Sequence, residues 1–141
     1  MDRVHGRLLR WRLLAPLLAA LLAGCATAPG RLVAVDDAGR LDRARVEAAA
    51  GPLVARGAAV AVFVVAQGDD RGEDFARRLD AVGLLRGGQI VPEGIGIYVS
   101  LAPRYSELRA GGRWSDALPP RRLRAIREEA LNVELRAGRP T

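Results

Sequence analysis

The adjacent carboxylates Asp36 and Asp37 are the residues of this sequence best suited to chemistry. Carboxylate oxygens are hard ligands of the kind that Ca²⁺ and Mg²⁺ prefer, so the pair predicts a divalent-metal site. Ca²⁺ takes about six to eight oxygen ligands, and Glu93 and Asp116 are candidates for the others if the fold brings their loops together. The alternative is structural, because aspartates also accept backbone N–H bonds in turns and at helix starts. A second acidic cluster, in residues 69–74, fits helix capping better than metal binding.

Catalysis by the mature chain is not expected from its side chains. The only histidine, His5, lies in the N-terminal leader, so Ser100, Ser106 and Ser115 have no histidine base to activate them. Cys25 is the only cysteine, which excludes an intramolecular disulfide, a CxxC redox pair and a cysteine metal cluster. No two aspartates are spaced two apart, as a phosphatase nucleophile and acid would be.

The first 24 residues have the order of a signal peptide. Four arginines precede an apolar run over residues 13–23, and small residues then lead into Cys25. The run is shorter than the roughly 20 apolar residues of a transmembrane helix. We therefore predict a signal-peptide helix over residues 1–24 that is removed from the mature protein.

The four residues Leu22-Ala23-Gly24-Cys25 resemble the lipobox of bacterial lipoproteins. This resemblance implies acyl chains on Cys25, where two or three chains make a durable membrane anchor, and a tether over residues 25–31. The alternative is an ordinary secretory leader with a chance cysteine. Ala26 is not the aspartate that signals inner-membrane retention, which implies the periplasmic face of the outer membrane in a Gram-negative cell. In a Gram-positive cell the protein would lie on the outer face of the plasma membrane.

The charge of the chain is modestly basic once the leader is removed. The formal net charge of +6 falls to +3, and every basic residue is arginine, which we attribute to codon usage; nucleic-acid binding is therefore not favoured. Arg121 and Arg122 belong to an arginine-rich C-terminal segment that is either a solvated helix face or a basic face toward anionic lipid. Trp114 is either a packing residue or an exposed loop residue that touches a partner or a lipid surface.

Hydrophobic periodicity predicts alternating strands and helices. A helix over residues 41–57 should kink or split at Gly51-Pro52, and residues 58–66 read as a central strand that is buried on both faces. The further predictions are helices over residues 69–85 and 118–138, and a hairpin of strands 94–101 and 104–111. The order predicts an α/β fold for residues 32–141: a three-layer single domain whose mixed sheet is flanked by helices, with at least one parallel strand pair joined by a crossover helix.

The order of these blocks resembles the TPM domain, the family found in the thylakoid lumen acid phosphatase and in bacterial membrane-tethered proteins. The blocks that carry the resemblance are VAVDDAGRLD, GAAVAVFVV, GEDFARRL, GIGIYVSL, RYSELRAG and IREEALNVELRAG. The sequence departs from the family at Pro92-Glu93-Gly94, where Asn-Gly or Asp-Gly is usual, and it ends at Thr141 before the family's final helix.

The resemblance implies Asp36 and Asp37 as site residues, with Ca²⁺ or Mg²⁺ as the cofactor if one is bound. We predict a membrane-anchored lipoprotein that acts as an interaction or accessory module for an envelope protein. Two alternatives stay open: a divalent-metal-dependent acid phosphatase that uses the acidic loop, and a binder of anionic lipid or nucleic acid through the C-terminal helix.

Overall fold

The computed structural model describes residues 29–138, so the predicted signal-peptide helix and Cys25 lie outside the described residues. Within that part of the chain, no helix has the length and apolar character needed to cross a membrane. The elements are β1 (Arg31–Asp36), α2 (Arg43–Ala55), β2 (Ala59–Val65), α3 (Glu73–Ala81), β3 (Leu85–Arg86), β4 (Gln89–Ile90), β5 (Gly94–Leu101), β6 (Arg104–Ala110), the 3-10 turn η1 (Gly112–Trp114), α4 (Pro120–Ile126), the π-helical turn η2 (Arg127–Leu131) and α5 (Asn132–Ala137). The last three follow one another without a break, and we call them the C-terminal helix.

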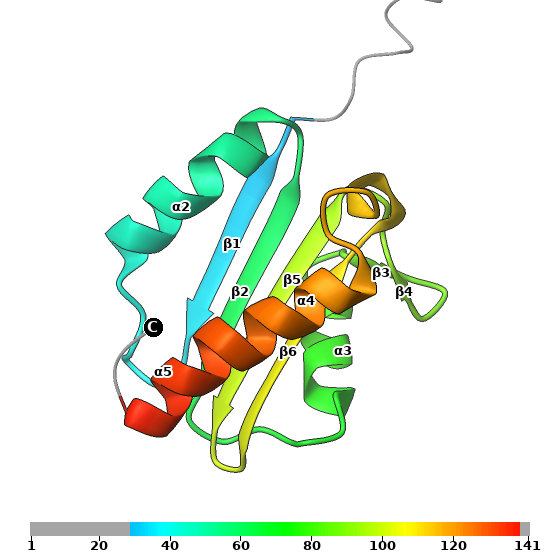
Figure 1. Ribbon diagram of the computed structural model, residues 1–141. Helices are drawn as coiled ribbons and strands as arrows, with labels where there is room; N and C mark the ends of the chain where they lie inside the picture. Colours follow the sequence, from blue (N-terminus) through cyan, green and yellow to red (C-terminus); the bar gives the residue numbers. More distant parts are fainter. Residues whose placement is uncertain (1–28, 139–141) are drawn as a thin grey trace, which may run out of the picture.

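Four strands form one mixed sheet in the order β1-β2-β5-β6. The first three are parallel and β6 is antiparallel to β5. α2 and the C-terminal helix cover one face of the sheet, and α3 packs on the other (Figure 1). The predicted three-layer α/β fold with a mixed sheet is confirmed.

β2 is central because its side chains can be buried on both faces. All seven of its residues are buried, and they alternate between the α3 side and the α2 side of the sheet. The predicted hairpin is also confirmed, since β5 and β6 pair across Ala102-Pro103.

The structure differs from the sequence prediction at two places near the N-terminus. Residues 31–36 form an edge strand, β1, which the sequence did not indicate because its pairing partner lies beyond α2 in the chain. α2 also continues through Gly51-Pro52 without splitting, and Pro52 lies on its exposed side. Asp42 caps the helix start by accepting the Arg45 N–H at 3.1 Å.

Candidate functional site

An apolar groove runs along the face of the sheet that α2 and the C-terminal helix share. Its volume is about 270 Å³, and all of its lining side chains are aliphatic. The floor consists of alternate residues from the two central strands: Val60, Val62, Val64, Ile95, Ile97 and Val99.

The groove exists because α2 does not fill the space above these strands. The wall that α2 presents includes Ala49 and Ala50, whose side chains are single methyl groups, and Leu53. Leu131 lines the groove from the C-terminal helix. α2 lies over the β1 side of the sheet and the C-terminal helix lies toward β6 (Figure 1), so neither helix covers the centre completely.

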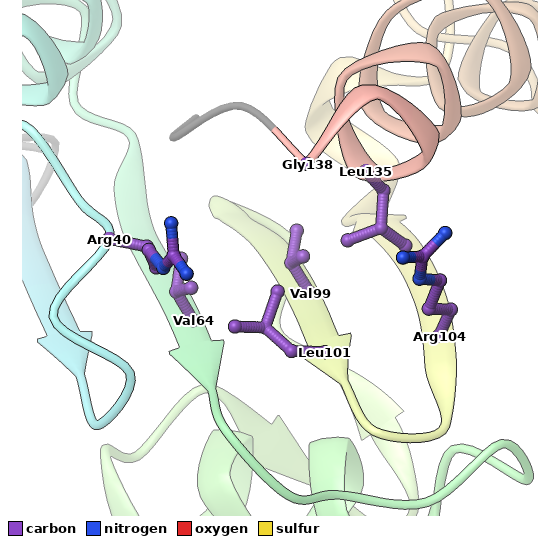
Figure 2. A pocket seen from close by; sticks show the side chains of 7 residues that line it. All are labelled: Arg40, Val64, Val99, Leu101, Arg104, Leu135 and Gly138. Carbon is purple, nitrogen blue, oxygen red and sulfur yellow. The ribbon is translucent and has the colours of Figure 1, made fainter.

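A second hollow, of about 180 Å³, adjoins the groove at the carboxyl ends of β2 and β5. Val64 and Val99 line both hollows. Figure 2 shows Arg40 and Arg104 on opposite sides of the second hollow, with Val64, Val99 and Leu101 between them. Within residues 29–138, neither guanidinium forms a salt bridge or a hydrogen bond. Two positive charges therefore flank the end of an apolar groove.

Asp36 fixes the loop that carries Arg40. Its carboxylate accepts the backbone N–H groups of Ala38 at 3.2 Å, Arg40 at 3.1 Å and Leu41 at 2.8 Å. Burial alone would raise the pKa of Asp36, but these N–H donors outweigh it and lower the pKa. The structural alternative for this residue is thus favoured: Asp36 shapes the turn that places Arg40 at the second hollow and Leu41 in the groove.

Asp37 belongs to a charged network on the α3 side of the sheet. Its Oδ2 lies 3.0 Å from Arg78 Nη1, and Arg78 Nε lies 2.9 Å from Asp74 Oδ2. The Tyr98 hydroxyl donates to the same Asp74 oxygen at 2.7 Å. Burial would raise the pKa of Asp74, but hydrogen bonds from Tyr98 and the arginines lower it overall. Asp37 therefore helps to hold the β1 end against α3.

The acidic cluster of residues 69–74 begins α3. Asp69 accepts the backbone N–H groups of Arg71 at 3.2 Å, Gly72 at 3.0 Å and Asp74 at 2.6 Å. Asp69 therefore accepts an N–H group from the first turn of α3, as the capping prediction requires, although the N-cap position itself is occupied by Gly72.

The four predicted metal ligands do not come together. Asp36 and Asp37 lie at the carboxyl end of β1, whereas Glu93 immediately precedes β5. β1, β2 and β5 are parallel, so their carboxyl ends lie together and their amino ends lie together at the opposite ends of the strands. Glu93 is therefore far from the aspartate pair. Asp116 follows η1, which packs near Glu93 through a Trp114 hydrogen bond. Among residues 29–138, no group of three or more His, Cys, Asp or Glu residues could hold a metal ion.

Of the two alternatives for Trp114, the structure shows the packing residue and not the exposed contact residue. Only 5% of this residue is exposed, and its Nε1 donates to the Glu93 carbonyl at 3.0 Å. η1 folds the loop back onto the sheet, and the guanidinium groups of Arg56 and Arg113 lie 5.9 and 5.3 Å from the indole centroid. The other two predicted contact residues, Arg121 and Arg122, are exposed on α4.

Arg40 and Arg104 were not predicted as site residues from the sequence. They are far apart in the chain, and each is one arginine among many. The only local signals were their positions, Arg40 in the acidic loop after a short apolar run and Arg104 directly after the hairpin turn.

Comparison with known proteins returns no match to any protein-family model, curated protein or solved structure.

Proposed function

We propose that this chain is a lipid-anchored bacterial envelope protein whose single domain is an interaction module rather than an enzyme. The domain would be held against an anionic membrane by the end from which its tether leaves. In a Gram-negative cell that membrane would be the periplasmic face of the outer membrane. The charge at the tether end of the domain carries this proposal.

Arginines gather at the end of the sheet where β1 begins. Arg31 is exposed and donates to the Val82 carbonyl at 2.6 Å, and Arg113 donates to the Arg56 carbonyl at 2.7 Å. Within the described residues, Arg31, Arg56 and Arg113 form no salt bridge. The ion pairs of Asp37 and Asp74 with Arg78 lie beyond the opposite end of β1. The three arginines at the tether end would orient that end toward an anionic surface.

The tether is short enough to keep the basic end near the bilayer. Residues 25–31 span at most about 25 Å when fully extended, and β1 starts at Arg31. Each arginine near an anionic surface contributes about 1 kcal/mol of attraction. The acyl chains would supply the anchor and the arginines would set the orientation.

The first test concerns the anchor. When the full chain is expressed in bacteria supplied with labelled palmitate, we expect the wild type to incorporate label and to fractionate with membranes. Cys25→Ser should abolish both, because it removes the thiol that is acylated. Equal labelling of the variant, or no labelling of the wild type, would contradict a lipid on Cys25.

The second test concerns the basic end and uses residues 26–141 without lipid. Vesicles of phosphatidylcholine that contain phosphatidylglycerol should bind this domain at low salt, and vesicles of phosphatidylcholine alone should not. The double variant Arg56→Gln, Arg113→Gln should weaken binding by roughly 2 kcal/mol, measured by vesicle co-sedimentation. Binding should fall as salt rises, because exposed charges are screened.

The matched control is Arg71→Gln, Arg136→Gln. It makes the same change in net charge with exposed arginines outside the tether end. If both double variants lose binding equally, net charge rather than a basic end is responsible, and the proposed orientation is excluded.

A further inference from the structure

We propose that the groove binds a single-chain anionic amphiphile, a fatty carboxylate, with its hydrocarbon chain over β2 and β5 and its head group between Arg40 and Arg104. The inference rests on the juxtaposition of a wholly aliphatic groove and two arginines without salt bridges in the described part of the chain. It goes beyond membrane anchoring and holds whether or not Cys25 is acylated.

The groove suits a hydrocarbon chain. Its floor extends along each central strand over five residues, Val60 to Val64 on β2, which is about 13 Å at the usual rise of a strand. No polar side chain lines it, so water inside would lack hydrogen-bonding partners. Every methylene that moves from water into such a site contributes about 0.8 kcal/mol. An alkyl chain therefore gains free energy by replacing that water.

The head-group end suits a carboxylate. Guanidinium groups bind carboxylates through two parallel N–H bonds, and Arg40 and Arg104 face the second hollow from opposite sides (Figure 2). The carbonyl end of α5 also lies there, at Gly138, but a helix end carries only about half a negative charge. Two full positive charges outweigh it, and the site favours an anion.

Other occupants fit less well. A partner α-helix is about 10 Å across, so a segment as long as the groove floor would occupy roughly 1,000 Å³. The groove offers only about 270 Å³. The chain's own apolar leader follows a run of arginines, so it offers the second hollow no negative charge. A cationic or neutral amphiphile would use the aliphatic floor and leave both arginines without a partner.

The test is a calorimetric titration of unlipidated residues 26–141 with decanoate below its micelle concentration. Decanol, decyltrimethylammonium and butanoate are titrated in parallel. We expect decanoate to bind at least about tenfold more tightly than decanol, in keeping with hydrogen bonds to a charged group. Decyltrimethylammonium should bind more weakly still, and butanoate should not bind because its chain is too short.

Variants locate the site. Arg40→Gln and Arg104→Gln should each weaken decanoate binding about tenfold and leave decanol binding unchanged. Ala49→Leu should fill the groove and weaken both ligands, because Ala49 lines it. The matched controls are Arg45→Gln and Ala48→Leu, which change exposed residues of α2 outside the groove lining and should bind as the wild type does.

Thermal melts establish that each variant folds before it is titrated. The proposal is overturned if the folded wild type does not bind decanoate. It is equally overturned if decanol binds as tightly as decanoate, or if the groove variants bind like their controls.

Discussion

Replacing Phe75 with alanine is expected to lower the free energy of unfolding by about 3–5 kcal/mol. Phe75 is fully buried on α3, where its ring stacks on Tyr98 at 5.2 Å and meets Phe63 edge-on at 6.2 Å. The guanidinium carbon of Arg109 lies 4.9 Å from the centroid of the Phe75 ring. The Phe75 ring packs on Gly96 of β5, where a Cβ would lie 2.8 Å from Phe75 Cζ. Because Gly96 has no side chain, it cannot fill the cavity that Phe75→Ala would leave. The loss is measured by equilibrium unfolding in urea.

The control for Phe75→Ala is Val133→Ala. Val133 is 45% exposed on α5, and its truncation should change the free energy of unfolding by less than about 0.5 kcal/mol. Comparable losses in the two variants would mean that α3 does not pack on the sheet as described.

Raising the pH from 10 to about 12 is expected to remove about 2 kcal/mol of stability through Tyr98. Burial of the hydroxyl, followed by its hydrogen bond to Asp74, raises the pKa of Tyr98 from 10 to about 12. A group whose pKa is raised on folding stabilises the protein fully below its unfolded pKa and loses that contribution as pH rises through the folded value. Stability should therefore be constant below pH 10 and fall between pH 10 and 12.

The composition of this chain makes the alkaline experiment unusually specific. Residues 26–141 contain no lysine and no cysteine, so Tyr98 and Tyr105 are the only side chains that titrate in this window. Burial and the Glu107 hydrogen bond also raise the pKa of Tyr105 to about 12. Urea unfolding across the window, compared between the wild type and Tyr98→Phe, isolates one of the two. If the variant loses as much stability as the wild type, Tyr98 is not the titrating group.

The two proposals place anchoring and ligand binding at opposite ends of the sheet. The tether and the exposed arginines Arg31, Arg56 and Arg113 lie where β1 and β2 begin, whereas Arg40 and Arg104 flank the hollow where β2 and β5 end. An amphiphile held in the groove would then have its head group directed away from the membrane, where an envelope partner could reach it.

The sequence by itself determined those elements whose own residue pattern shows which of their faces is buried. The continuous apolar run of β2, the hairpin of β5 and β6 and the amphipathic α3 were predictable because local periodicity reports which face of an element is buried. The turn role of Asp36 and the capping role of Asp69 were foreseeable for the same reason, since each accepts N–H groups a few residues along the chain.

Only the tertiary structure decided how distant segments meet. β1 became a strand by pairing with β2 across α2, and Trp114 was buried by a contact with Glu93. The groove depends on what α2 and the C-terminal helix leave uncovered, and Arg40 and Arg104 face one hollow only because β1 and β6 lie on either side of the central strands. Side-chain periodicity does not indicate how much volume is left between two elements, nor which loops lie together at one end of the strands. These features could therefore be found only in the folded chain.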